Sequence, residues 1–135
     1  MLSVRRRTRS YAQQDRNTAF ASMLTITTGD RPMTVINVFT VAPTQQGRLV
    51  ELLTQATESS IRHVPGFVSA ALHRSLDGTK VTMYAQWATP EHYDRMRARP
   101  DTSPFLGEAL AIARFDPGFY EVVGVFAPDA SRPAV

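Results

Sequence analysis

Residues 33–127 alternate between two hydrophobic periods, and this alternation restricts the fold more than any other feature of the chain. Short segments rich in β-branched and aromatic residues predict four strands, at 33–42, 67–76, 80–88 and 118–127. Between the first two strands, residues 44–64 carry leucine and alanine at helical spacing with polar residues between them. That spacing predicts a helix.

Turn and capping residues mark where these segments begin and end. Thr44 is a suitable N-cap for the helix that follows it. The Asp77-Gly78 pair between the second and third predicted strands is a hairpin signal. Thr89 and Ser103 are each followed by proline, which predicts the starts of two short helices. The order of elements is therefore β-α-β-β-α(α)-β.

This order predicts an α+β fold of the ferredoxin-like split β-α-β type. Compact, unknotted chains with this order form one four-stranded antiparallel sheet with helices on one face. The predicted strands are apolar on both sides, so Tyr84, Val122 and Phe126 would expose a second apolar face in a monomer. We therefore expect two copies to pack their sheets together in a homodimer.

The positive charge of the chain belongs to its N-terminal segment. Residues 1–32 contain six arginines and two aspartates, and their polar composition predicts a disordered basic tail. Residues 33–135 contain nine basic and ten acidic side chains. A nearly neutral domain lacks the clustered positive charge that nucleic-acid binding requires. We expect one folded domain at 33–127, followed by a C-terminal tail at 128–135.

Composition also limits where in the cell the protein is expected and which cofactors it could bind. The 135 residues include no cysteine, which excludes disulfides and thiolate sites. The sequence contains no apolar run of the roughly 18 residues that span a bilayer. It contains no apolar segment of the secretory type after the N-terminal arginines. It has neither a glycine-rich dinucleotide turn nor a metal-ligand cluster. We therefore expect a cytoplasmic protein without a membrane partner, a metal or another cofactor.

Three stretches of the sequence together resemble a known family. They read "TVINVFTVAP", "VPGFVSAALHRSLDGT" and "YAQWATPEHY", and the resemblance extends over about residues 33–127. The chain resembles the antibiotic biosynthesis monooxygenase domain, and most of all the cofactor-independent anthrone oxygenases of aromatic polyketide biosynthesis. The resemblance implies a dimeric α/β barrel with a pocket between the sheet and the helices of each subunit.

The resemblance also implies an enzyme that uses dioxygen to convert a polycyclic aromatic polyketide, an anthrone-type phenol, into a quinone. Triplet dioxygen reacts slowly with closed-shell molecules, but a deprotonated anthrone is electron-rich enough to be its own electron donor. The protein then has to bind a flat aromatic system, favour its anion and exclude bulk water.

Four residues are the catalytic candidates. Asn37 interrupts an apolar strand, and its amide can donate a hydrogen bond to an oxyanion. Trp87 offers an aromatic wall and an indole N–H. Tyr93 and His73 match a tyrosine and a histidine of the related enzymes. The resemblance implies that Tyr93 hydrogen-bonds the substrate or relays a proton, and that His73 acts as a base. The alternatives stay open: Trp87 and Tyr93 as core residues, and Asn37 and His73 on the surface.

The resemblance implies five substrate-binding residues, which are Phe39, Phe67, Met83, Met96 and Leu110. Met83 is a departure, because the related anthrone oxygenases carry an asparagine at this position. Methionine has no donor that stabilises an enolate.

Other functions remain open at this stage. A polyketide cyclase or a non-catalytic small-molecule-binding dimer fits the same fold. A haem-binding or haem-degrading relative fits less well, because the axial histidine expected about ten residues after the tryptophan is replaced by Arg97.

Overall fold

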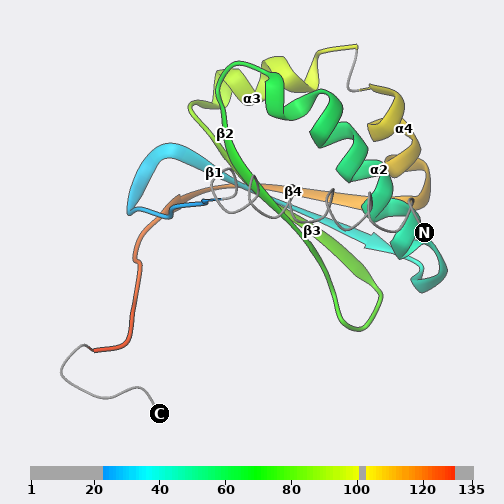
Figure 1. Cartoon of the computed structure of the whole chain (residues 1–135), viewed down its shortest axis with the longest axis horizontal. Helices are drawn as coiled ribbons and strands as arrows, with labels where there is room; N and C mark the ends of the chain where they lie inside the picture. Colours follow the sequence, from blue (N-terminus) through cyan, green and yellow to red (C-terminus); the bar gives the residue numbers. More distant parts are fainter. Residues whose placement is uncertain (1–22, 101–102, 130–135) are drawn as a thin grey trace, which may run out of the picture.

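The computed structural model describes residues 23–100 and 103–129. Four strands form one antiparallel sheet in the order β2-β3-β1-β4, and α2, α3 and α4 all lie on one face of it (Figure 1). This arrangement confirms the predicted ferredoxin-like fold. The elements are β1 (Gly29–Val41), η1 (Pro43–Gln45), α2 (Gln46–Ser59), η2 (Ile61–His63), β2 (Phe67–Arg74), β3 (Lys80–Trp87), α3 (Pro90–Arg97), α4 (Ser103–Ile112) and β4 (Ala113–Val122).

The first strand begins earlier than the sequence predicted. β1 starts at Gly29 instead of Met33, because Gly29 pairs with Val122 of β4 across a register shift. Strand pairing uses the backbone, so polar side chains at this end of β1 do not prevent it. The rest of the predicted tail, 1–22, lies outside the described residues. So does 130–135 of the predicted C-terminal tail.

The last strand also differs from its prediction. The predicted strand 118–127 was wrong by five residues, since β4 runs from Ala113 to Val122 and includes Pro117. Proline is excluded from central strands because it cannot donate to a neighbour, but β4 is an edge strand that pairs only with β1. The shift brings Phe115 into the sheet, opposite Phe39 of β1, while Phe119, which the predicted strand already included, lies opposite Val35.

One of the two predicted helix caps is present in the structure and the other is not. Thr89 caps α3 as predicted, because its side chain accepts a hydrogen bond from the backbone N–H of His92. Thr44 does not cap α2; it lies inside η1, which begins at Pro43, and α2 has no side-chain cap. Proline favours the first position of such a turn because its φ is already fixed. No helix in 23–100 or 103–129 is long and apolar enough to cross a membrane.

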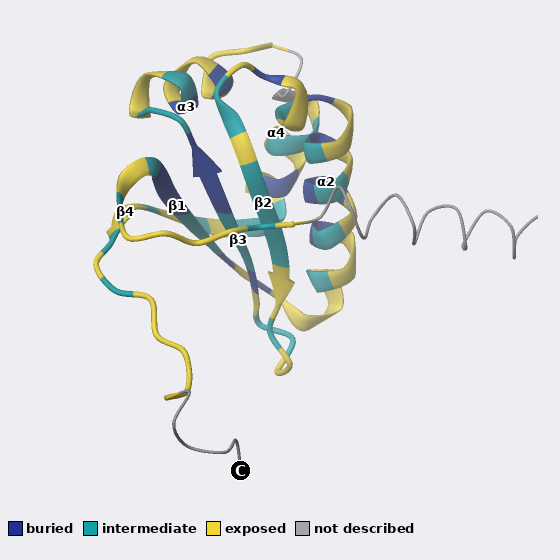
Figure 2. Ribbon diagram, turned by 60° about the vertical axis from the view of Figure 1, so that its left-hand side comes forward, coloured by how far each residue is buried: buried dark blue, intermediate teal, exposed yellow. Residues whose placement is uncertain are grey.

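The helix-facing side of the sheet carries two separate apolar cores. Figure 2 shows buried positions on β1 and β3 and on the side of α2 that faces the sheet. One core lies under α2 and α4 and contains Phe39, Val41, Leu49, Leu52, Leu53, Val81 and Ala109. The other lies under α3 and contains Met33, Val35, Val64, Ala85, Trp87, Tyr93 and Met96. Asn37 lies on β1 between Val35 of one core and Phe39 of the other, on the same face of the strand. Asn37 is therefore a polar side chain that stands between the two cores and belongs to neither.

The β2–β3 hairpin is closed by a polar turn around Asp77. Asp77 Oδ1 accepts hydrogen bonds from Ser75 Oγ at 2.7 Å, from Thr79 Oγ1 at 2.7 Å and from the Thr79 backbone N–H at 3.0 Å. Gly78 follows with a φ of +82°, which glycine adopts without strain. The hydrogen bonds from Ser75 and then Thr79 lower the pKa of Asp77 from 3.8 to about 2.

We expect Asp77→Asn to flatten the acid limb of the stability curve. Because the pKa of Asp77 is lowered in the folded state, its stabilising effect is complete above pH 3.8 and is lost as the pH falls toward about 2. The melting temperature of the wild type should therefore fall more steeply over this interval than that of the variant. Asp116→Asn, at an exposed position of β4, is the control. Parallel curves for wild type and Asp77→Asn would contradict this account.

Candidate active site

A cavity of about 340 Å³ opens between the sheet and helices α3 and α4. Its size is within the range of small-molecule sites, roughly 300–1,000 Å³. It lies beside Asn37, on the side of the sheet formed by β1 and β4. Its lining residues are Asn37, Phe39, Tyr93, Arg97, Leu106, Gly107, Leu110 and Phe115.

Two phenylalanine rings form an apolar floor for this cavity. Phe39 and Phe115 are directly opposite each other on β1 and β4, with ring centroids 5.0 Å apart and planes tilted by 32°. Phe39 is buried at 4% exposure, so the floor lies at the closed end of the cavity. A pair of rings in this arrangement offers a flat aromatic ligand both dispersion contacts and stacking geometry.

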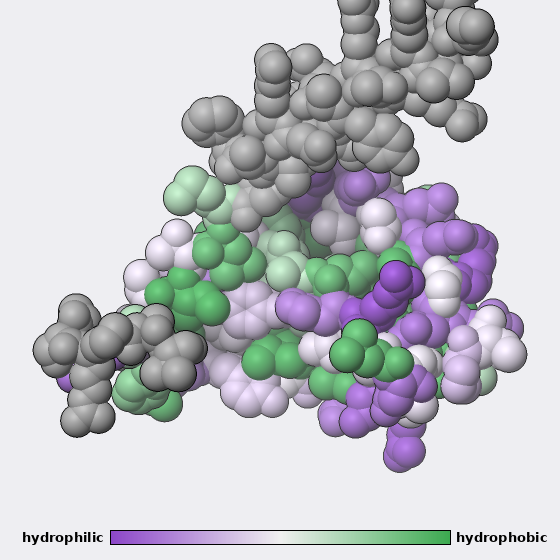
Figure 3. All heavy atoms as spheres, turned by 60° about the horizontal axis from the view of Figure 1, so that its bottom comes forward, coloured by the Kyte–Doolittle hydropathy of each residue, from purple (hydrophilic) through white to green (hydrophobic). Residues whose placement is uncertain are grey.

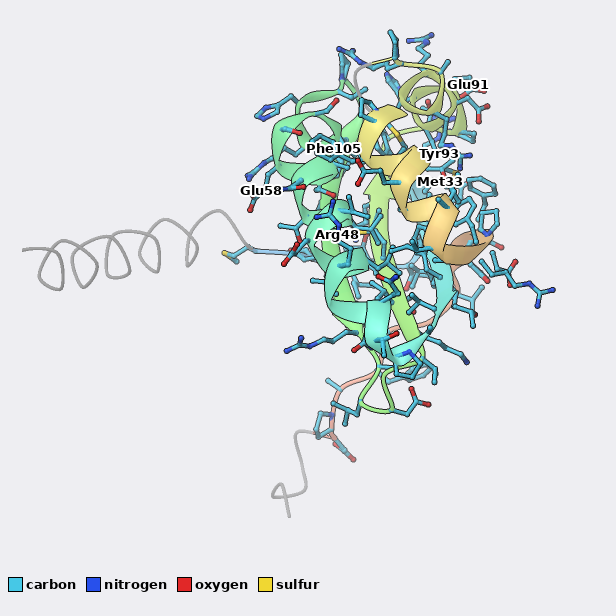
Figure 4. The ribbon with its side chains drawn as sticks, turned by 90° about the vertical axis from the view of Figure 1, so that its right-hand side faces the viewer. Met33, Arg48, Glu58, Glu91, Tyr93 and Phe105 are labelled. Carbon is cyan, nitrogen blue, oxygen red and sulfur yellow. The ribbon has the colours of Figure 1, made fainter. Side chains whose placement is uncertain are left out.

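Tyr93 connects the apolar core to the polar groups of the cavity. Its ring is buried and makes edge-to-face contacts with Trp87 at 5.9 Å and Phe119 at 5.2 Å. Its hydroxyl accepts hydrogen bonds from Asn37 Nδ2 at 3.4 Å and from Arg97 Nη1 at 3.3 Å. Figure 4 shows Tyr93 beside α4, the helix that forms the opposite wall. Because the hydroxyl oxygen accepts from both neighbours, its own proton is available to a ligand.

Asn37 provides an unused acceptor in the same place. Its Oδ1 atom is buried and has no hydrogen-bond partner among residues 23–100 and 103–129. Leaving a buried carbonyl-type oxygen unpaired costs about 1–3 kcal/mol. A ligand with a hydroxyl group in the cavity would satisfy this atom.

Arg97 is the positively charged residue of the lining. It is exposed and therefore lies where the cavity meets solvent, with its guanidinium carbon 5.2 Å from the centroid of the Phe115 ring. Arg97 and Tyr93 are four residues apart on α3, so both side chains project from the same face of the helix. The charge is thereby held over the aromatic floor.

The structure brings four of the nine predicted site residues to this cavity, namely Asn37, Tyr93, Phe39 and Leu110. Trp87 is 1% exposed and lies behind Tyr93 in the core beneath α3. Met96 belongs to the same core. These two residues are placed to support the Tyr93 ring and do not line the cavity themselves.

The other three predicted residues lie elsewhere. Met83 is directly opposite Asn37 on β3, but it lines a separate hollow of about 160 Å³ beside α2. Phe67 contacts the Trp87 ring edge-on at 5.4 Å and borders a third hollow near Met23. His73 is exposed on β2, one residue after the inward-facing Leu72, and so points to the opposite sheet face.

Sequence reasoning missed four lining residues, which are Arg97, Leu106, Gly107 and Phe115. Phe115 was missed because the last strand was predicted to begin three residues after it. Leu106 is four residues before the predicted Leu110 on α4, and this spacing was a usable signal. Arg97 was considered only as a replacement for a haem ligand. Among the described residues, no three histidine, aspartate or glutamate side chains are grouped closely enough to hold a metal ion.

Comparison with known proteins agrees with this fold. The family model described as "Antibiotic biosynthesis monooxygenase" matches residues 32–105. The chain is 42% identical over 104 residues to tetracenomycin-F1 monooxygenase of Streptomyces glaucescens, covering 77% of this chain and 93% of that protein.

Solved structures give the same result. A monooxygenase from the gene ActVA-Orf6 of Streptomyces coelicolor, in complex with the ligand nanaomycin D, is 34% identical with a TM-score of 0.61. That match covers 73% of this chain and 94% of the other. A variant of SnoaB, a cofactor-independent oxygenase from Streptomyces nogalater, shares the fold with 23% identity, a TM-score of 0.61 and coverage of 72% and 97%. The predicted family and enzyme class are thereby confirmed, and the chain belongs to the antibiotic biosynthesis monooxygenase family.

Proposed function

We propose that this protein is a cofactor-independent monooxygenase that oxidises an anthrone-type polycyclic aromatic polyketide to a quinone. The observation that carries the proposal is the cavity in which the Asn37 amide and the Tyr93 hydroxyl meet above the Phe39–Phe115 floor. Similarity to tetracenomycin-F1 monooxygenase and to the nanaomycin D complex supports an aromatic polyketide as the substrate.

The reaction balances without an external reductant. The methylene group of an anthrone loses a proton to water to give an enolate, and the enolate transfers an electron to dioxygen. Recombination at the same carbon gives a peroxide anion, which takes a proton back from water and then loses water to leave a carbonyl group. One oxygen atom ends in the quinone, and the other leaves in water with both methylene hydrogens. The substrate therefore supplies all the electrons, and the protein has to favour the enolate.

In this proposal Asn37 and Tyr93 stabilise the enolate oxygen. The bond between Asn37 Nδ2 and the Tyr93 hydroxyl is long, at 3.4 Å, so the amide can turn toward a stronger acceptor at small cost. The Tyr93 proton is a second donor, and Asn37 Oδ1 accepts from a hydroxyl group of the substrate. Donors held in a largely apolar cavity stabilise an anion far better than water does, because they need no reorganisation. Trp87 acts through Tyr93, and the exposed His73 has no assigned role.

We expect Asn37→Ala to lower kcat for anthrone oxidation by roughly 10²–10³, the usual effect of removing an oxyanion donor. The assay uses metal-free, flavin-free protein with emodin anthrone under oxygen, and quinone formation is followed by absorbance. Thr40→Ala, an exposed change on the same strand, is the control. No acceleration over buffer by the wild type would refute the oxygenase, whereas unchanged kcat in Asn37→Ala would refute only the role of this residue.

A second variant separates the hydroxyl of Tyr93 from its ring. Tyr93→Phe keeps the edge-to-face contacts with Trp87 and Phe119, so its melting temperature should change little. Loss of the donor should lower kcat by about tenfold or more. The matched control is Tyr84→Phe, on the opposite sheet face, where kcat should stay at the wild-type value. A normal kcat in Tyr93→Phe would remove this residue from the proposed chemistry.

We further propose that the enzyme is a cytoplasmic homodimer. Its cysteine-free composition fits a reducing compartment. The face of the sheet away from the helices shows several hydrophobic patches between polar groups (Figure 3). Tyr120 is 52% exposed on this face of β4, and Val123, Val125 and Phe126 are between 55% and 93% exposed in the segment that follows the strand. A second copy of the chain, packed over this face and over the segment after β4, would remove these side chains from water.

Sedimentation at low micromolar concentration should therefore show a species of twice the 15.0 kDa chain mass. Phe126→Glu should shift the distribution toward the monomer, because a charge replaces an apolar contact. Leu76→Glu, a change of the same kind at the exposed hairpin tip, should not. A wild-type protein that sediments only at the chain mass would rule out the dimer.

A further inference from the structure

Arg97 places a positive charge at the open end of the cavity, and it has no ion pair with the described residues. The ion pairs within residues 23–100 and 103–129 are those of Arg48 with Glu51 and Glu108, and Arg97 takes part in none. One N–H of its guanidinium donates to the Tyr93 hydroxyl, and the group lies over the Phe115 ring. Of the five N–H donors of the group, the Tyr93 contact uses one, which leaves enough for a bidentate partner.

The position of Arg97 at the end of α3 does not by itself account for its place in the cavity. Arginine is favourable in the last turn of any helix because it opposes the helix dipole, and Arg95 and Arg97 both occupy the last turn of α3. Only Arg97 also lines the cavity. Its neighbours there include Phe115, Leu106 and Leu110, so the guanidinium would meet a ligand that lies in the cavity. The planar fork of its donors matches a carboxylate or another anionic oxygen group.

We propose that Arg97 binds an anionic oxygen group on the edge of the aromatic substrate and so selects acidic polycyclic aromatics. This inference rests on the proposed function, because it takes the cavity as the aromatic site. The rings lie on the Phe39–Phe115 floor with the reacting carbon toward Asn37 and Tyr93 at the buried end. The anionic group, a carboxylate or an ionised phenol, lies at the rim against Arg97. Arg97 is thus a specificity-determining residue.

Binding of stable quinones tests this selection without turnover. Quenching of the fluorescence of Trp87, the single tryptophan, reports occupancy because Trp87 contacts Tyr93 in the cavity wall. The probes are anthraquinone-2-carboxylate and the neutral 2-hydroxymethylanthraquinone. The wild type should bind the carboxylate about 10–100-fold more tightly, the range expected for a hydrogen-bonded charge. Arg97→Met should lose this preference, Arg97→Lys should keep part of it, and the control Arg95→Met should keep all of it.

A pH series distinguishes the two anionic groups that a ligand can present to Arg97, a carboxylate and an ionised phenol. Preference for the carboxylate should be constant from pH 6 to 9, whereas 2-hydroxyanthraquinone should bind more tightly only as its phenol ionises. Equal binding of acidic and neutral quinones by the wild type would overturn the proposal. So would an undiminished preference in folded Arg97→Met, or no binding of either quinone. An Arg97-dependent preference in a protein that oxidises no anthrone would instead sustain this inference and refute the oxygenase.

Discussion

The site depends on the burial of one aromatic ring, that of Tyr93, between Trp87 and Phe119. These edge-to-face contacts hold α3 against β3 and β4, and the hydroxyl of the same side chain is hydrogen-bonded to two other residues of the cavity lining. Asn37 from the sheet and Arg97 from the helix both donate to that hydroxyl. Its position thereby determines where the polar groups of the cavity stand relative to the apolar floor. Loss of the ring would disturb the core and the site together.

The cavity lies beside Asn37, the polar side chain that stands between the two apolar cores. α2 and α4 are held by leucines over Phe39 and Val81, with a weak exposed ion pair between Arg48 and Glu108 joining the two helices. α3 is held separately over Trp87. Asn37 lies between the cores, so its amide faces a space instead of packed side chains. A reaction whose substrate supplies its own electrons requires little more than such a space and a few fixed donors.

The parts of the fold that repeat a simple period could be predicted from the sequence. The alternation in β1 and β3 gave the correct faces, and Asn37 was identified because it interrupts an apolar row. Alternation shows which face of the sheet a side chain is on, but it does not show how deeply that side chain is buried. Trp87 does share the helix-facing side with Met83, but the turn into α3 places Tyr93 over it, so the tryptophan lies in the core.

The residues that were missed depend on neighbours that are distant in the sequence. Pro117 is normally excluded from strands, and only the position of β4 at the edge of the sheet makes it acceptable there. Because the strand can include Pro117 at the edge of the sheet, it also includes Phe115, and Phe115 thereby reaches the cavity. Arg97 looks like an ordinary solvent-exposed residue of a short helix. Its role becomes visible only when β4 brings the Phe115 ring beneath its guanidinium.

A crystal structure of the protein with a bound hydroxyanthraquinone tests the central claim most directly. The account predicts one molecule on the Phe39–Phe115 floor, with a ring oxygen within hydrogen-bond distance of Asn37 and the Tyr93 hydroxyl. A quinone bound instead in the hollow beside Met83, or against the far face of the sheet with this cavity unoccupied, would contradict it.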